Sequence, residues 1–219
     1  MYIPKAFAVT DLDALHGLIA QTPLALLVSQ GEQGLQASHL PLLLKPDEGE
    51  FGTLYGHFAR ANPQWRGLAA GAEVLLVFQG AEAYVSPSFY PAKAEHGKVV
   101  PTWNYQAVHA YGQAEVFEDR ERLLALVSAL SDRHEQGRER PWAVSDAPVE
   151  YVDSMLRAIV GFALPISRIE GSFKLSQNKD AANFQGVQQG LQQSERATER
   201  QLAQAMAALQ TDGQGLLKP

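Results

Sequence analysis

The sequence predicts a mostly β fold with added helices (α+β), an antiparallel barrel or sandwich of six or seven strands. Short apolar runs follow one another with only turns or short loops between them, which is typical of antiparallel strands. Segments with helical spacing of apolar residues occur near the start, after the predicted sheet and at the end of the chain. Because strands and helices do not alternate regularly, a doubly wound α/β sheet is not expected.

The first part of the chain contains one helix and most of the predicted strands. Asp11 can cap a helix that reaches Gln21, and Pro23 ends it. Asn62 is placed to cap a short helix with Pro63 at its first position. The strands expected here are residues 24–29, 35–44, 53–58, 72–78 and 82–86, with turns at 30–34 and 79–81.

The second part adds the remaining strands and most of the helices. Asp119 can cap a long helix, because Leu123, Leu126 and Leu130 recur at helical spacing after it. Pro165 should bend the last strand. The elements expected here are a loop at 87–98, a strand at 105–118, a helix after Asp119, a helix at 147–156, a strand at 158–173, two helices within 180–210 separated near 192–194, and a frayed end at 211–219.

Composition limits the class of protein. The 219 residues include no cysteine, which excludes disulfides, thiolate catalysis and cysteine-based zinc sites. The N-terminal residues lack the pattern of a signal peptide, and no window approaches about 18 uninterrupted apolar residues, so we expect a cytoplasmic protein without a membrane span. The net charge of −6, with scattered Lys and Arg, does not predict nucleic-acid binding, although a local basic patch is left open.

The stretch from Val99 to Gly112 is dense in side chains that combine flat apolar faces with hydrogen-bonding tips. Such side chains can stack against a ligand and orient it, but aromatic and β-branched residues also favour strands for packing reasons alone. The sequence of the stretch does not decide between a ligand wall and a packed sheet. The residues concerned are Thr102, Trp103, Asn104, Tyr105, His109 and Tyr111.

Four further segments carry polar side chains within predicted strands or at their ends. They are 38–41, 56–65, 83–90 and 171–179. Arg60 and the helix start capped by Asn62 both favour phosphate. Lys174 can pair with an anion, while the amides of Gln177 and Asn178 can recognise the edge of a heterocycle. Each segment also has a purely structural interpretation, as a core histidine, a capped corner, a polar turn or a loop with a helix cap at Asn178.

Established catalytic and metal-binding patterns are missing from the sequence. No GxGxxG, Walker, HExxH or GxSxG motif occurs, and no Ser-His-Asp triad can be recognised. His39, His57 and His109 are the only plausible metal-binding trio, but their spacing matches no known local ligand pattern. We therefore expect no metal site, and whether the protein is an enzyme is left open because no catalytic acid or base stands out.

Taken in order, these segments resemble the PaiB family of FMN-binding negative transcriptional regulators. Several motifs in the same order, covering nearly the whole chain to about Leu191, make the resemblance specific. The departures are Phe89, where an aromatic that is often Trp is expected, and Ser172, where a Lys is expected. The matching motifs are Met1-Tyr2-Ile3-Pro4 with Phe7, Ser38-His39-Leu40-Pro41, Gly56-His57 through Ala59-Arg60-Ala61-Asn62-Pro63 to Trp65, Tyr84-Val85-Ser86-Pro87-Ser88 with Tyr90, Val100-Pro101-Thr102-Trp103-Asn104-Tyr105 with Val108-His109, Pro141-Trp142, Gly161, and Lys174-Leu175-Ser176-Gln177-Asn178.

The resemblance implies an antiparallel split β-barrel of the pyridoxamine-phosphate-oxidase-like, FMN-binding type, with a helical C-terminal tail. It implies a homodimer with FMN at the subunit interface, and a regulatory role in transcription. Residues 1–178 would form the FMN-binding domain, and residues 179–219 a helical extension packed on the barrel or the dimer. Two alternatives stay open: a flavin-dependent oxidoreductase of the same class, and a DNA-binding repressor that acts without flavin.

The resemblance and the residue chemistry together also suggest which side chains contact FMN. Arg60 and Lys174 would hold the phosphate, and the isoalloxazine ring would lie against residues 39–40 and 102–104. A DNA or regulatory protein partner in addition to the second subunit is left open. The expected FMN-binding residues are Ser38, His39, Leu40, His57, Arg60, Asn62, Thr102, Trp103, Asn104, Lys174, Gln177 and Asn178.

Overall fold

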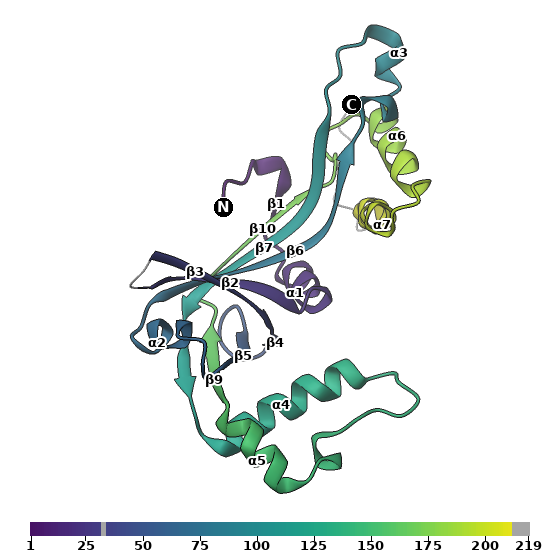
Figure 1. Cartoon of the computed structure of the whole chain (residues 1–219). Coiled ribbons are helices and arrows are strands. Elements are labelled where there is room, and N and C mark those ends of the chain that lie inside the picture. The colour runs from purple at the N-terminus through teal and green to yellow at the C-terminus, as the bar shows by residue number, and fades with distance from the viewer. Residues whose placement is uncertain (32–33, 212–219) are drawn as a thin grey trace. The chain divides into compact units, whose positions relative to one another are not determined.

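The chain divides into two compact units in the computed structural model, which describes residues 1–31 and 34–211 (Figure 1). Unit 1 contains Met1–Asp11, Gln79–Val108 and the residues from Glu170 onward. Unit 2 contains Leu12–Phe78 and His109–Ile169. Each unit is therefore assembled from segments that are far apart in the sequence.

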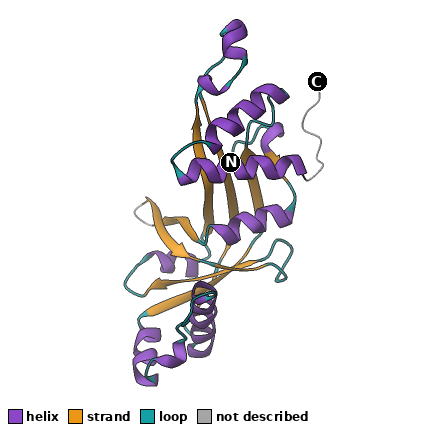
Figure 2. Ribbon diagram, turned by 90° about the vertical axis from the view of Figure 1, so that its right-hand side faces the viewer, coloured by secondary structure: helices purple, strands orange, loops and turns teal. Residues whose placement is uncertain are grey.

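The helices and strands are distinguished by colour in Figure 2. Helical segments are η1 (Lys5–Phe7), α1 (Leu12–Gln21), α2 (Gln64–Ala69), η2 (Pro87–Phe89), α3 (Ala92–His96), α4 (Arg120–Glu135), η3 (Val144–Asp146), α5 (Val149–Arg157), α6 (Ala181–Gln192) and α7 (Ala197–Thr211). Strands are β1 (Ala8–Val9), β2 (Leu24–Gly31), β3 (Gly34–Pro41), β4 (Leu43–Lys45), β5 (Thr53–Ala59), β6 (Glu73–Val85), β7 (Thr102–Gln113), β8 (Glu115–Phe117), β9 (Ile159–Pro165) and β10 (Arg168–Lys174).

The strands form a six-stranded sheet in the order β1-β10-β7-β6-β2-β3 and a four-stranded sheet in the order β4-β5-β9-β8. Strands β6, β7 and β10 each continue from one unit into the other. The pairs β1–β10, β2–β3, β2–β6, β4–β5, β5–β9 and β8–β9 are antiparallel. The prediction of a mostly β, antiparallel fold with added helices is therefore confirmed.

Unit 2 has a core in which α4 and α5 pack on the four-stranded sheet. The start of α4 is as predicted, because the Asp119 carboxylate accepts a hydrogen bond from the Arg122 N–H at 2.8 Å. Burying each large apolar side chain contributes about 1.5–3 kcal/mol, so the leucine stripe of α4 is a major source of stability. The core cluster consists of Phe117, Leu123, Leu126, Leu130, Leu156 and Ala163.

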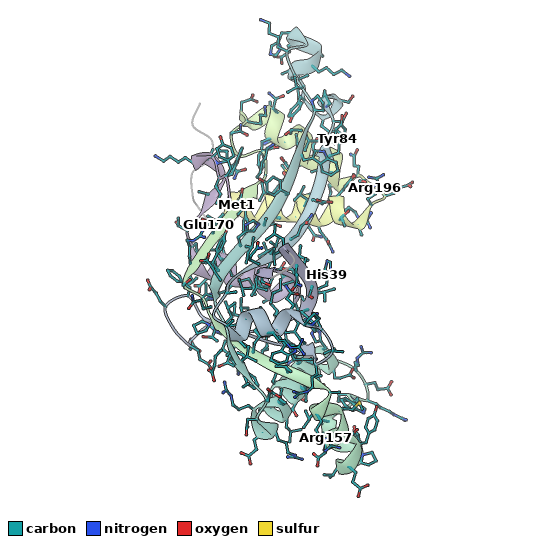
Figure 3. All side chains as sticks on the ribbon, turned by 60° about the vertical axis from the view of Figure 1, so that its left-hand side comes forward. Met1, His39, Tyr84, Arg157, Glu170 and Arg196 are labelled. Carbon is teal, nitrogen blue, oxygen red and sulfur yellow. The ribbon has the colours of Figure 1, made fainter. Side chains whose placement is uncertain are left out.

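In unit 1, α6 and α7 lie side by side (Figure 1). Asp180 caps α6 by accepting a hydrogen bond from the Asn183 N–H at 2.9 Å, so the cap expected at Asn178 is wrong by two residues. The N-terminal ammonium group pairs with Glu170 at 2.6 Å, and the two residues are labelled in Figure 3. The buried apolar side chains of the two helices are Phe184, Val187, Leu191, Leu202, Ala203 and Met206.

Several predicted element boundaries differ from the structure. The turn expected at 79–81 is wrong, because β6 continues through it, and Gly80 does not adopt a positive φ. The single strand expected at 158–173 is two strands in different sheets, since the chain changes partners after Pro165. The strand expected at 35–44 is likewise divided into β3 and β4, and the loop expected at 87–98 contains η2 and α3.

Two predictions concern residues on which the structure is silent. Residues 32–33 of the turn expected at 30–34, and residues 212–219 of the frayed end, lie outside the described residues. The division expected between residues 178 and 179 stays a prediction. Among the helices within residues 1–31 and 34–211, none is long and apolar enough to cross a membrane.

Helix α6 packs closely against η2 at two glycines, Gly186 and Gly190. A Cβ added at Gly186 would lie 2.2 Å from the Phe89 carbonyl oxygen, and one added at Gly190 would lie 2.4 Å from the Phe89 ring. We predict that Gly186→Ala lowers the free energy of unfolding by about 1–3 kcal/mol, because backbone must shift to admit the methyl group. Chemical denaturation measures this change.

Gly17→Ala in α1 is the matched control. Nothing lies within 4 Å of a Cβ added at Gly17, so this variant should gain up to about 1 kcal/mol from better helix propensity. If Gly186→Ala is stabilised as much as Gly17→Ala, the close contact between α6 and η2 is contradicted.

Candidate functional site

Two lysines and a threonine form a polar corner in unit 1, which we call the lysine corner (Thr102, Lys174 and Lys179). Thr102 begins β7 and Lys174 ends β10, and the Lys174 Nζ donates a hydrogen bond to the Thr102 Oγ1 at 2.6 Å. Burial, together with the positive charge of Lys179, lowers the pKa of Lys174. The corner therefore concentrates positive charge in a half-buried place.

The lysine corner is bordered by aromatic rings. The Lys179 Nζ lies 5.3 Å from the centre of the Tyr90 ring, and the Lys174 Nζ lies 5.9 Å from that of Phe7. Neither lysine takes part in any of the salt bridges found among the described residues. The Tyr90 hydroxyl is buried without a hydrogen-bond partner in the described structure, and burial raises its pKa. Cation–π contacts leave the lysine charges uncompensated, so an anion would be attracted here.

The loop after β10 is held by the side chain of Gln177. Its Oε1 accepts a hydrogen bond from the Leu175 N–H at 2.6 Å, and its Nε2 donates to the Phe173 carbonyl at 2.5 Å. These bonds stabilise the turn in which Ser176 adopts a left-handed φ of 63°. Gln177 thus shapes the loop that carries the two lysines, while Asn178 is exposed on it.

Asn104 is fully buried beneath α7. Its Nδ2 donates to the Ser176 Oγ at 2.9 Å and lies 4.0 Å from the Met206 sulfur, while its Oδ1 has no partner within residues 1–31 and 34–211. Its neighbour Trp103 is 53% exposed and forms an edge-to-face pair with Tyr84, with ring centres 6.1 Å apart (Tyr84 is labelled in Figure 3). The stretch from Val99 to Gly112 thus provides both packed sheet and an exposed aromatic surface.

In unit 2, the predicted residues Ser38 and Asn62 belong to one hydrogen-bond network. The Asn62 Nδ2 donates to the Ser38 Oγ at 3.0 Å, and the Ser38 Oγ donates to the Gln64 Oε1 at 2.6 Å. The Asn62 Oδ1 accepts from the Gln64 N–H at 3.0 Å, so Asn62 caps α2 as predicted. The network ties the start of α2 to β3, which gives both residues a structural role.

Arg60 already has hydrogen-bond and charge partners within unit 2. Its guanidinium donates to the carbonyls of Arg157 at 2.7 Å and Ile159 at 3.1 Å, and it pairs with Glu118. A carboxylate therefore compensates its charge, in contrast to the two lysines. Its predicted contact with FMN stays a prediction.

The remaining predicted residues of unit 2 differ in exposure. His39 points to solvent from β3 and is labelled in Figure 3, whereas Leu40 is only 9% exposed. His57 on β5 is half-buried, and burial lowers its pKa. Its directly opposite cross-strand neighbour is Gly161, which has no side chain.

The structure thus divides the twelve predicted residues equally between the two units. It brings Lys174 to Thr102, and Ser38 to Asn62. Sequence reasoning missed Lys179, Tyr90 and Gln64, all of which lie within segments that it had singled out. In the part of the chain that the structure describes, no group of three or more His, Asp or Glu side chains could hold a metal ion.

Comparison with known proteins connects this fold to flavin binding. A protein-family model described as "Putative FMN-binding domain" matches residues 1–168. The "Protease synthase and sporulation protein PAI 2" of Bacillus subtilis (strain 168) is 36% identical over 206 residues, which are 94% of this chain and 96% of that protein. The chain belongs to the PaiB family of FMN-binding proteins. The prediction of FMN as the cofactor is therefore confirmed at the level of the family. Lys174 and Lys179 lie beyond residues 1–168, the range that the family model matches.

Solved structures of other proteins have a fold similar to that of this chain. The FAD and heme binding protein from Mycobacterium smegmatis has a TM-score of 0.54 at 20% identity, covering 76% of this chain and 73% of that chain. The flavocytochrome Anf3 from Azotobacter vinelandii has a TM-score of 0.56 at 16% identity, covering 78% and 72%. The prediction of a PaiB-type split barrel is confirmed.

Burial of His57 predicts a pH dependence of stability. Because its pKa is lower in the folded chain than in the unfolded chain, the unfolded chain takes up the proton first as the pH falls. The free energy of unfolding should therefore decrease on acidification through about pH 6.5, and His57→Gln should remove this component. Chemical denaturation at about pH 7.5 and about pH 5.5 measures it. The exposed His96 is the control: His96→Gln should keep the wild-type difference, and an unchanged difference in His57→Gln would contradict the prediction.

Proposed function

We propose that this chain is an FMN-binding regulatory protein in which the lysine corner binds the FMN phosphate. The observation that carries this proposal is the pair of half-buried lysines, Lys174 and Lys179, which no carboxylate neutralises among the described residues. A phosphate dianion would restore the charge balance, and the Thr102 hydroxyl would supply a hydrogen bond beside it. The residues present therefore fit a phosphate-bearing cofactor.

The neighbouring side chains fit the rest of such a cofactor. Trp103 and Tyr84 offer exposed aromatic faces for a flat ring. The hydroxyl of Tyr90, whose ring lies beside Lys179, has no hydrogen-bond partner among the described residues. Bound FMN would supply the capacity to accept and release electrons. The FMN contacts that the family resemblance implies for Ser38, His39, Leu40, His57, Arg60 and Asn62 stay predictions and are not part of the lysine-corner site.

We predict that Lys174→Met and Lys179→Met each raise the Kd for FMN about 10- to 100-fold, the cost of losing a charge-assisted hydrogen bond. Quenching of FMN fluorescence on binding measures this. Affinity for riboflavin, which lacks the phosphate, should be the same in wild type and Lys174→Met.

Lys93→Met is the control for this prediction. Lys93 lies on α3 in the same unit, where it donates to the Ser88 Oγ at 3.1 Å, and the substitution makes the same change in net charge. An unchanged FMN affinity in both lysine-corner variants, or an equal loss of FMN and riboflavin affinity, would contradict a phosphate site at this corner.

An apolar sheet face in unit 2 supports a homodimer. Leu26 lies opposite both His39 and Val77, and Val28 lies opposite Leu75, so these side chains share one face of β3-β2-β6. Leu24 and Leu35 in the same strands are 63% and 77% exposed. Contiguous apolar surface of this kind is typical of protein interfaces. We infer that a second copy of the chain covers this open sheet face, which consists of Leu24, Leu26, Val28, Leu35, Leu75 and Val77.

We predict that Val28→Asp converts the homodimer to a monomer, because a carboxylate would then be buried without a partner at the centre of the open sheet face. Analytical ultracentrifugation measures the mass in solution. Val149→Asp is the control, since Val149 on α5 is 68% exposed but lies on another element. A dimer that persists in Val28→Asp, with Val149→Asp also dimeric, would place the interface elsewhere.

The regulatory role proposed here is negative regulation of transcription of the PaiB type. It is supported by membership of the family and by the name of the Bacillus relative, a protease synthase and sporulation protein. The net charge of −6 favours action through a partner over direct binding to DNA. A gel-shift assay at physiological salt separates these two routes.

A further inference from the structure

Unit 2 contains a cavity of about 290 Å³ between β5 and α4, which we call the His57 cavity. Its apolar lining includes Pro41, Val127, Leu130 and Trp142, and its polar lining includes His57 and Ser131. The volume is at the lower end of the range for small-molecule sites. This volume suits a single-ring compound better than FMN, which has three fused rings and a ribityl phosphate.

The imidazole of His57 has no hydrogen-bond partner in the described part of the chain. Its Nδ1 is buried and has no hydrogen bond, because the cross-strand neighbour is Gly161 and the Phe117 ring fills the space of the missing side chain. A buried N–H without an acceptor is rarer than a buried lone pair without a donor, so we place the proton on Nε2. Among the described residues no group bonds to Nε2, which is therefore free to donate to a ligand in the cavity.

Trp142 forms one wall of the cavity, and a hydrogen bond from its backbone N–H holds it in place. The Trp142 N–H donates to the Glu135 Oε2 at 3.1 Å, and the same carboxylate pairs with the Arg138 Nε at 3.2 Å. Trp142 is nevertheless 47% exposed and lines the cavity, so it offers an aromatic surface to a ligand there. Glu135 also lines the cavity, and because Arg138 compensates its carboxylate, this side chain offers no free charge to an ionic ligand.

We propose that the His57 cavity binds a small, flat, uncharged ring compound whose carbonyl oxygen accepts a hydrogen bond from the His57 Nε2–H. The apolar residues and the Trp142 indole would contact the ring, and His57 would recognise the carbonyl. This site is separate from the lysine corner and does not depend on the proposed FMN phosphate site.

The test compares acetophenone with ethylbenzene, which has the same shape but no carbonyl. Titration of the full-length protein, followed by NMR of the His57 ring Cε1–H, gives both dissociation constants. We expect acetophenone to bind about 3- to 10-fold more tightly, the usual effect of one neutral hydrogen bond. His57→Phe, followed by saturation transfer to the ligands, should remove this preference, and His96→Phe should keep it.

Trp142→Ala provides a second variant, because an exposed residue can be truncated without endangering the fold. It should weaken both ligands while leaving FMN affinity unchanged. Equal binding of the two compounds to wild type, a preference that survives in His57→Phe, or displacement of acetophenone by FMN would each overturn the proposal. FMN affinity measured on the same samples shows independently whether the lysine corner works as proposed.

Discussion

The antiparallel pairing of β5 with β9 is the contact on which the rest of unit 2 depends. Gly56 lies opposite Phe162 and His57 lies opposite Gly161, so each strand has a glycine where its partner has a ring. A Cβ at Gly56 would lie 2.7 Å from the Phe162 ring, and one at Gly161 would lie 2.4 Å from the Phe117 ring. The Phe117 ring takes the space that Gly161 leaves on the side of the sheet where α4 packs, and the Phe162 ring takes the space beside Gly56 on the other side. The same arrangement deprives His57 of a hydrogen-bond partner, so packing and ligand recognition have a common origin.

Lys174 and Lys179 in unit 1 keep positive charges that could attract an anion. Arg60 in unit 2 has its guanidinium neutralised by Glu118 and held by two carbonyls, which makes it a structural residue. Lys174 and Lys179 instead rest against aromatic rings and repel one another. Such an arrangement costs stability in the unliganded chain, and binding sites are where this cost is commonly found. Arg60 has a carboxylate partner, whereas the two lysines have none among the described residues. This difference marks the lysine corner as the candidate phosphate site, which residue type alone does not.

Sequence patterns were most informative where the deciding interactions are local. Asp119 and Asn62 cap their helices as expected, because a capping bond joins residues only two or three apart. Predictions failed where a distant strand decides. Gly80 suggests a turn, yet β6 continues through it, and the chain after Pro165 leaves one sheet for the other. Neither outcome can be inferred from neighbouring residues, since strand partners are supplied by other parts of the chain.

By itself, the sequence determined the class of fold, the family and its cofactor, because ordered motifs and hydrophobic spacing are properties of the linear chain. Only the tertiary structure decided which polar side chains keep donors or acceptors that no other group of the protein uses. Gln64 and Arg60 use theirs on groups far away in the sequence, whereas Lys179 and His57 find no such partner among the described residues. The physical reason is that a hydrogen bond needs its acceptor within about 3 Å, and only folding brings those groups together.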